Sequence, residues 1–251
     1  MARTFETSHM KTLIQRLLPA IVAAGMLIGG GAQAAIQISS TRVVMNEEQQ
    51  HVSVFAKNLS SEPYVVQVWI DGAAEEMDTP FFITPPLSRF DGGVERRLNI
   101  SRVGEGMPND RESYYWINVL EIPQKKDHSE NVLSLAVQTR IKLFYRPAAI
   151  QKLPRGPELL KWSLAREGKA CQLVVENASA FLVNFARIEL ASETNEFGRG
   201  VVAAPLAASR IPLSKCPSAA NPQVIPHVVN DYGVIRPWPA AVVDFAAPPV
   251  P

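Results

Sequence analysis

Short β-rich runs separated by turn residues most constrain what this chain can fold into, because they recur from Ile36 almost to the end. Two of these runs, His51–Ala56 and Tyr64–Asp71, place apolar residues on one face at a period of two, which is typical of strands that bury one face in a core. After residue 34, no stretch long enough to form a regular helix shows the 3.6-residue period of apolar residues that a helix needs. The sequence therefore predicts a nearly all-β protein.

A proline-rich stretch, Arg146–Pro157, divides the runs into two groups, since its three prolines forbid a continuous strand. The predicted strands before it are Ile36–Val44, Gln50–Asn58, Tyr64–Asp71, Phe81–Thr84, Gly93–Ile100, Tyr114–Ile122 and Asn131–Tyr145. Those after it are Lys161–Arg166, Ala170–Glu176, Phe181–Leu190, Val201–Ala203, Ser209–Leu213, Gln223–Val229 and Ala241–Phe245. Seven strands in about 110 residues match an immunoglobulin-like sandwich. We therefore predict two immunoglobulin-like β-sandwich domains, at residues 35–150 and 151–251.

The first 34 residues have the pattern of a removable export signal. Lys11 and Arg16 precede an apolar stretch, Leu17–Gly31, and the small residues of Ala32–Ala34 follow it. Either Met1 or Met10 fits as the start of this leader. The stretch is too short and too interrupted for a stable membrane span, and no later run approaches the ~20 apolar residues that a span needs. The chain is expected to be exported and not to span a membrane.

The charge balance argues against a nucleic-acid partner. Of 25 basic and 24 acidic side chains in the full sequence, residues 1–34 hold three basic ones (Arg3, Lys11 and Arg16) and one acidic one (Glu6), which leaves 22 against 23. A protein that binds duplex nucleic acid by its charge needs a basic face. The near-neutral mature chain is therefore expected to recognise its partners by other means.

Two cysteines, Cys171 and Cys216, lie in the C-terminal half. Export to an oxidising compartment favours a disulfide between them, and a pair of buried free thiols is the alternative. Their separation does not fit a metal knuckle of the C-x-x-C kind. The sequence also contains no nucleophile elbow and no phosphate-binding glycine loop, and its four histidines are scattered. We predict neither an enzyme nor a bound cofactor or metal.

The run Asn131–Tyr145 is long for a strand, whose usual length is about 5–6 residues. Its odd positions are apolar almost throughout, from Leu133, Leu135 and Val137 to Tyr145. An open edge with alternating apolar side chains is the geometry by which one protein adds a strand to the sheet of another. The same alternation also fits a strand that lines only its own core, and the pattern alone does not separate the two.

Several strings, in a fixed order along nearly the whole mature chain, carry a family resemblance. They are Thr41–Val44, Thr84–Pro86, Pro108–Ser113, Trp116–Pro123, Gln138–Pro147 and Asn230–Gly233. Together they resemble the periplasmic chaperones of the chaperone–usher pilus pathway. The short connection from Pro123 to Glu130 is similar to that of the short-loop, PapD-like members.

The resemblance implies two immunoglobulin-like domains set at an angle, with a cleft between them that holds the C-terminal carboxylate of a pilus subunit. The matching anchor residues are Arg42 and Lys142. A carboxylate taken out of water needs charge-assisted hydrogen bonds, which these two side chains can donate. The matching donor strand has Leu133, Leu135 and Val137 as the side chains inserted into the subunit. Without the resemblance, both cations also fit ordinary exposed strand positions.

Glu112, Arg146 and Asp231 match a family trio of charges thought to fix the two domains relative to each other, and unrelated surface charges are the alternative. The implied function is that of a periplasmic chaperone. It binds, folds and caps fimbrial subunits by donor-strand complementation and delivers them to an outer-membrane usher, with some tendency to self-associate when free. The alternative is an exported pilus subunit, adhesin or other binding module. The long strand in mid-chain favours the donor over the recipient.

Overall fold

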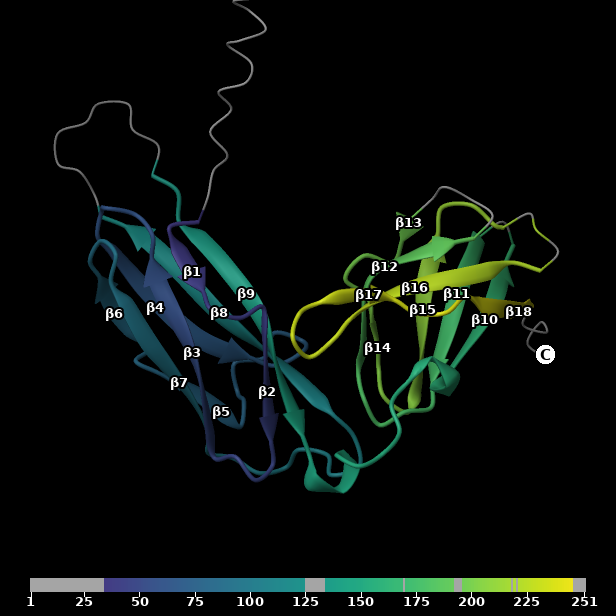
Figure 1. Ribbon diagram of the computed structural model, residues 1–251, viewed down its shortest axis with the longest axis horizontal. Coiled ribbons are helices and arrows are strands. Elements are labelled where there is room, and N and C mark those ends of the chain that lie inside the picture. Colours follow the sequence, from purple (N-terminus) through teal and green to yellow (C-terminus); the bar gives the residue numbers. More distant parts are fainter. Residues whose placement is uncertain are drawn as a thin grey trace, which may run out of the picture. The chain divides into compact units, whose positions relative to one another are not determined.

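The computed structural model describes residues 34–124, 134–168, 170–191, 196–217, 219 and 221–245. It confirms the prediction of a nearly all-β chain with two domains, of which the first holds β1 to β9 and the second β10 to β18 (Figure 1). In these ranges the helical elements are two short 3₁₀ turns in the linker, η1 (Ala148–Ile150) and η2 (Pro157–Leu159). Residues 1–33 of the predicted export signal lie outside the described residues.

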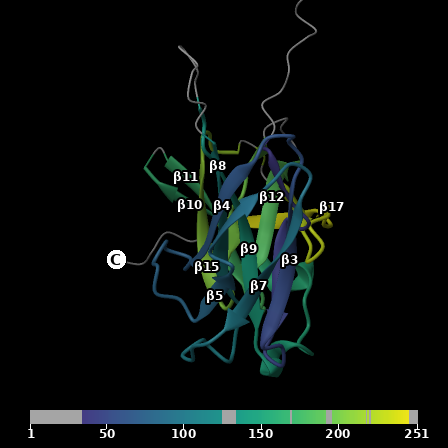
Figure 2. The ribbon, with the colours of Figure 1, turned by 90° about the vertical axis from the view of Figure 1, so that its left-hand side faces the viewer.

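The first domain contains two sheets. A four-stranded antiparallel sheet has the order β1-β3-β7-β5 and a five-stranded sheet has the order β2-β9-β8-β4-β6, with a parallel pair at β2 and β9 (Figures 1 and 2). The strands are β1 (Ile36–Ile38), β2 (Arg42–Asn46), β3 (His51–Asn58), β4 (Tyr64–Asp71), β5 (Phe81–Thr84), β6 (Leu87–Phe90), β7 (Glu95–Arg102), β8 (Ser113–Pro123) and β9 (Val137–Arg146).

The predicted strand Ile36–Val44 is wrong, because the chain changes sheets within it. β1 pairs with β3 in one sheet, and β2 pairs with β9 in the other. The break at residues 39–41 coincides with a change in the phase of the apolar alternation, since Ile36 is buried before it and Val43 and Met45 after it. The crossing brings Arg42 alongside β9.

The predicted strand Asn131–Tyr145 begins too early. β9 starts at Val137, residues 134–136 are not in a strand, and residues 131–133 lie outside the described residues. The ladder with β8 ends at the pair Glu121 and Val137, close to where β8 itself ends at Pro123. Proline has no amide to donate to the ladder, so β8 gives the residues before Val137 no continued pairing.

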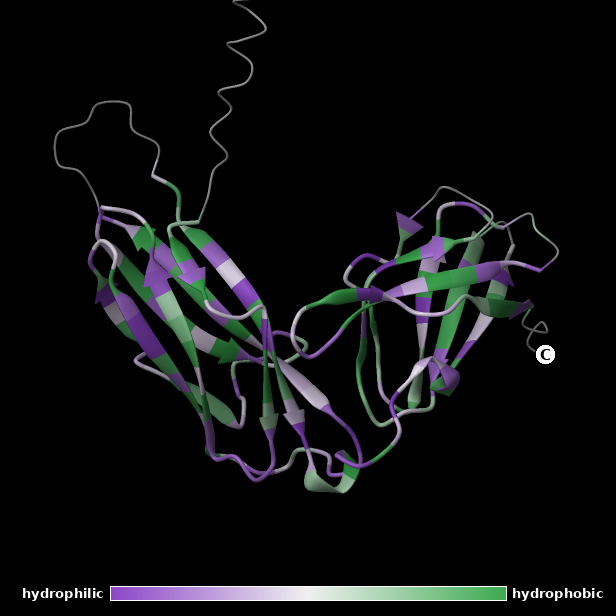
Figure 3. Cartoon of the chain, in the orientation of Figure 1, coloured by the Kyte–Doolittle hydropathy of each residue, from purple (hydrophilic) through white to green (hydrophobic). Residues whose placement is uncertain are grey.

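Each sheet of the first domain turns one apolar face toward the other, and Figure 3 shows the resulting alternation of hydrophobic and hydrophilic residues along the strands. The core draws on both sheets and includes Val54, Leu98 and Ile100 from one and Val66, Val68, Ile117 and Leu143 from the other. On β9, Ile141, Leu143 and Tyr145 point into this core, so the even-numbered Lys142 lies on the opposite face.

The second domain has its own core around Trp162, Leu173, Phe185 and Ile211. Its sheet has the order β13-β12-β16-β18-β10-β11-β15, with β14 paired to β12 and β17 to β16. The strands are β10 (Leu160–Glu167), β11 (Ala170–Asn177), β12 (Val183–Leu190), β13 (Glu196–Phe197), β14 (Val202–Ala203), β15 (Ala207–Leu213), β16 (Gln223–Val229), β17 (Ile235–Pro237) and β18 (Ala241–Phe245). The sequence did not predict β6, β13 or β17.

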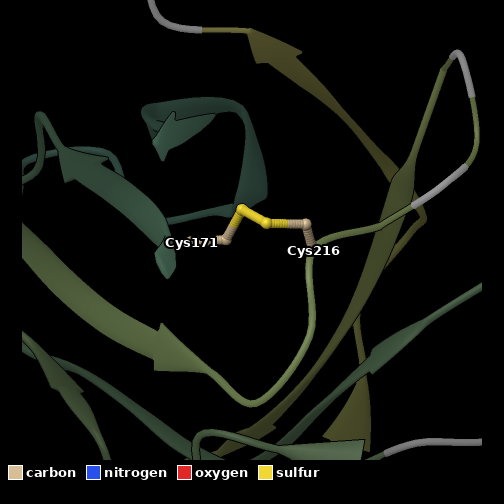
Figure 4. The surroundings of a disulfide bond; sticks show 2 residues. All are labelled: Cys171 and Cys216. Atoms are coloured by element: carbon tan, nitrogen blue, oxygen red, sulfur yellow. A yellow bond between two sulfur atoms is a disulfide. The ribbon is translucent and has the colours of Figure 1, made fainter. Parts of the chain in front are cut away.

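The two cysteines form a disulfide in the second domain, as predicted (Figure 4). Cys171 lies in β11 and Cys216 follows β15, and their Cα atoms are 5.3 Å apart. The bond closes a loop of 45 residues. Restricting the unfolded chain in this way stabilises the domain by about 4 kcal/mol in the chain-entropy model.

Candidate functional site

Arg42 and Lys142 lie side by side on neighbouring strands. The two residues are register partners in the parallel pair of β2 and β9. They line a cavity of about 350 Å³ together with Trp116 of the first domain and with Asn184, Phe185 and Val229 of the second. The structure therefore brings the two predicted anchor residues into one cavity whose walls come from both domains.

The Lys142 ammonium is held in a partly buried position. Burial, together with the nearby Arg42, lowers the pKa of Lys142 from 10.5 to about 8. Its Nζ donates a hydrogen bond of 2.7 Å to Asn184 Oδ1. The same atom lies 5.3 Å from the ring centre of Tyr114 and 5.2 Å from that of Trp116, within the range of a cation–π interaction. These contacts stabilise a cation that would be costly to bury without partners.

The Arg42 guanidinium is only partly satisfied. Nη1 donates to the Val229 carbonyl at 3.2 Å, and the guanidinium lies 5.6 Å from the Phe144 ring centre. Its Nε is buried and has no acceptor among the described residues. Burial lowers the pKa of Arg42, but arginine stays charged in any case. Two neighbouring cations with donors to spare form a site suited to a carboxylate.

The predicted charge trio comes together where the two domains meet. Arg146 donates to Glu112 Oε1 from Nε at 3.0 Å and from Nη2 at 2.7 Å, and to Asp231 Oδ2 from Nη1 at 3.1 Å. The second oxygen of Glu112 accepts the Leu182 amide at 3.0 Å. Burial raises the pKa of Glu112, and Arg146 and the Leu182 amide oppose that shift. The trio therefore joins the segment just before β8, the end of β9 and the second domain.

Arg155, which sequence reasoning missed, extends this network. Its Nη1 and Nη2 each donate to one oxygen of Asp231 at 2.9 Å. Burial favours a higher pKa for Asp231, but the hydrogen bonds from Arg155 and Arg146 outweigh it and lower the pKa to about 2. Both guanidinium groups also lie over the Phe181 ring, at 5.0 Å for Arg155 and 5.3 Å for Arg146. Arg155 lies in the proline-rich linker, where no periodic pattern of residues marks it as part of a site.

The turn that carries Asp231 is built by its neighbours. The side-chain Oδ1 of Asn230 accepts the backbone amides of Tyr232 and Val234, both at 3.0 Å. Gly233 has a φ of 81°, in the left-handed region that favours glycine, and a Cβ there would clash with the Thr41 hydroxyl. The turn can therefore approach the residue before Arg42 closely.

Two of the predicted donor residues lie at the N-terminal end of β9, Val137 as its first residue and Leu135 just before it. Val137 is 38 % exposed and Leu135 is 62 % exposed, whereas Leu133 lies outside the described residues. Val137 has the same parity as the buried Ile141 and Leu143, so the apolar face of β9 continues beyond the part that its own core covers. Val137 lies five positions before Lys142, roughly 17 Å along the strand.

Two family models match the two domains in order. The model for the N-terminal domain of PapD, a pili and flagellar-assembly chaperone, matches residues 35–151, and the model for the C-terminal domain of the pili assembly chaperone PapD matches residues 156–239. The chain belongs to the pilus assembly chaperone family. The boundary predicted between residues 150 and 151 stays a prediction, as does the short-loop subclass, because residues 125–133 lie outside the described residues.

Curated and solved relatives of this chaperone agree with the assignment. It is 39 % identical to the probable fimbrial chaperone LpfB of Escherichia coli O157:H7 over 70 % of this chain and 74 % of that one. It is 34 % identical to the chaperone protein FimB/FhaD of Bordetella pertussis over 92 % and 98 % of the two chains. The solved YadV chaperone is 30 % identical, with a TM-score of 0.70 over 83 % of this chain and 100 % of that one. All three relatives carry the name of a chaperone.

Within the described part of this chaperone, no helix is long and apolar enough to cross a membrane. The same residues include no group of three or more histidine, cysteine, aspartate or glutamate side chains that could hold a metal ion.

Proposed function

We propose that this pilus assembly chaperone binds the C-terminal carboxylate of a fimbrial subunit on Arg42 and Lys142. Residues 133–137 then complete the unfinished sandwich of that subunit. The observation that carries the proposal is the continuity of β9, which joins a cationic cavity at one end to an exposed apolar face at the other. Because the donor residues precede the anchor Lys142 on one continuous segment, they fix the register, and a slip by one residue would turn every inserted side chain to the wrong face.

The contacts at the cavity support the carboxylate as the anchored group. Lys142 and Arg42 are both partly buried, and the Arg42 Nε has no acceptor in the described part of the chain. A carboxylate would supply oxygens to both side chains and offset the repulsion between two neighbouring cations. The C-terminus of an extended peptide is the carboxylate that can reach the cavity while the rest of the peptide runs along β9.

The exposed face of β9 supports the strand donation. Burying a large aliphatic side chain is worth about 1.5–3 kcal/mol. Leu133, Leu135 and Val137 together would contribute several kcal/mol before the cost of ordering the complex is subtracted. That contribution is enough to hold an incomplete subunit, and it blocks polymerisation for as long as the donor strand stays in place.

Export and delivery complete the proposal. The predicted leader and the disulfide Cys171–Cys216 support a location in the oxidising periplasm. From there the chaperone would hand its subunit to an outer-membrane usher, where the extension of another subunit replaces the donor strand. The exposed Leu135 and Val137 also favour self-association of the free chaperone.

The alternative of a pilus subunit, adhesin or other binding module is not favoured, since the relatives of the chain are chaperones. No enzymatic step and no cofactor are part of the proposed function, because holding and releasing a subunit requires only binding free energy.

The test is co-expression in the periplasm with the pilin-like proteins encoded beside this gene. Wild type, Arg42→Ala and Lys142→Ala are compared by co-purification, and Lys57→Ala, at an exposed lysine of β3, is the matched control. We expect stable complexes with wild type and the control, and their loss in both anchor variants. Full retention of partners by folded anchor variants would contradict the proposal.

A further inference from the structure

Asn184 is a buried polar residue that points away from the core of its own domain. It lies in β12 between Val183 and Phe185, which both belong to the hydrophobic core of the second domain. Because side chains alternate along a strand, the amide faces the opposite way, where it lines the cavity that holds Arg42 and Lys142. Only 6 % of its surface is exposed.

The amide makes a direct contact with the anchor. Asn184 Oδ1 accepts the hydrogen bond of 2.7 Å from Lys142 Nζ. Among the described residues, this ammonium has no other hydrogen-bond acceptor. We infer that Asn184 is the positioning residue of the carboxylate site: its Oδ1 holds the Lys142 ammonium at the cavity, and its Nδ2 is available to donate to the bound carboxylate.

A neutral amide suits this position better than an acid or an aliphatic side chain. An aspartate would form an ion pair with Lys142, occupy its donors and repel an incoming carboxylate. An aliphatic residue would leave the ammonium without its acceptor in a partly desolvated place. The amide combines an acceptor for the lysine with a donor for the ligand, which no ionised carboxylate can do.

The charged and titratable groups around Lys142 make the role measurable. Arg42 faces it from β2 and Tyr114 from β8, while Arg140 precedes it on β9; Asn184 is the neutral contact from the second domain. Burial, the first cause of the shift, and Arg42 both lower the pKa of Lys142, to about 8. Half of its charge is therefore lost near pH 8, where a change in its acceptor has the largest effect on its protonation.

The inference rests on the proposed function, and the test separates the two. The probe is an alternating valine–threonine peptide, fluorescently labelled at its amino end, with either a free or an amidated C-terminus. Binding to the whole mature chaperone is measured at pH 6 and pH 8 for wild type, Asn184→Ala, Asn184→Asp and Lys142→Ala. Gln172→Glu, on β11 of the same domain, adds a negative charge outside the residues that line the cavity and is the matched control for the aspartate.

We expect Asn184→Asp to weaken binding of the free-carboxylate peptide more than tenfold and Asn184→Ala at least threefold at pH 8, with a smaller loss for the alanine at pH 6. Gln172→Glu should bind as wild type does. The pKa of Lys142, measured by NMR of ¹³C-methylated lysines, should rise in Asn184→Asp and fall in Asn184→Ala. This second measurement needs no peptide, and the alanine variant carries the test if the aspartate variant does not fold.

One outcome would contradict the role of Asn184, and another would contradict the carboxylate anchor itself. If Lys142→Ala abolishes binding while both Asn184 variants bind as wild type and leave the pKa of Lys142 unchanged, the role of Asn184 is wrong and the proposed function stands. If wild type does not prefer the free carboxylate to the amide, the carboxylate anchor itself is wrong, and the positioning role falls with it.

Discussion

The two ends of β9 share one alternating pattern and have opposite surroundings. At the C-terminal end, Leu143 is 0 % exposed, the strand is paired on both sides by β2 and β8, and Arg146 joins the second domain. At the N-terminal end, within the described residues, Val137 pairs only with β8, and Leu135 pairs with no strand and is exposed. The difference teaches that one strand can stabilise its own fold with one half and remain available for a partner with the other.

The largest effect should come from removing the charge that joins the buried end to the second domain. Arg146→Ala leaves Glu112, whose side chain is 1 % exposed, without its cation, and breaking such a buried pair costs about 3–5 kcal/mol. Chemical denaturation of the whole chain measures the loss. Arg140→Ala is the matched control on the same strand, because its ion pair with Glu75 is solvent-exposed and should contribute less than about 1 kcal/mol. Equal losses in the two variants would contradict the comparison.

A slightly smaller effect is expected from the core contact at the buried end. Leu143→Ala removes a fully buried side chain and should cost about 2–5 kcal/mol of the free energy of unfolding, since a cavity is left behind. Urea denaturation followed by tryptophan fluorescence measures it. A loss below about 1 kcal/mol would mean that this end of β9 does not form part of the core.

Acid should weaken the buried end through Asp231. Its pKa is about 2 in the folded chain, below its ordinary value of 3.8, so between these values the unfolded chain binds a proton that the folded chain does not. The stabilisation is present above about pH 4 and is lost as the pH falls toward 2. Thermal unfolding between pH 2 and pH 6 should show a smaller decline for Asp231→Asn than for wild type. Parallel declines would exclude this carboxylate as a source of the acid sensitivity.

The smallest effect on stability should come from the exposed end. Leu135→Ser and Val137→Ser remove apolar side chains that the described core does not cover, so the free energy of unfolding should change by about 0.5 kcal/mol or less. Capture of subunits in the co-expression assay should nevertheless fall. Large destabilisation by either variant would mean that the N-terminal end serves the chaperone's own core.

The fold was predictable from the sequence where alternation is long and of one phase, as in β3 and β4. The fold was not predictable where it depends on which strands pair, because a local pattern gives no information on pairing. The crossing between β1 and β2 was missed although the change of phase between Ile36 and Val43 signals it. The start of β9 was placed too early because the partner strand ends at Pro123, which a single run of residues cannot reveal.

The site shows the same division. Arg42, Lys142, Glu112, Arg146 and Asp231 followed from matching strings in the sequence, and the structure brings them into the two clusters described above. Arg155 and Asn184 were missed because their partners are 76 and 42 residues away and neither lies in a matching string. Contacts of this kind arise only from tertiary structure.

The parallel pair of β2 and β9 has a consequence for the order in which this protein matures. Arg42 and Lys142 are register partners although a hundred positions (42 to 142) separate them, so nearly the whole first domain must be synthesised and paired before the two cations meet. Contacts at such a sequence separation form late and slowly, because the entropy of closing a long loop must be overcome first. The pair of cations thus cannot form in a half-folded chaperone, and under the proposed function a subunit would bind only a chaperone whose own folding is complete.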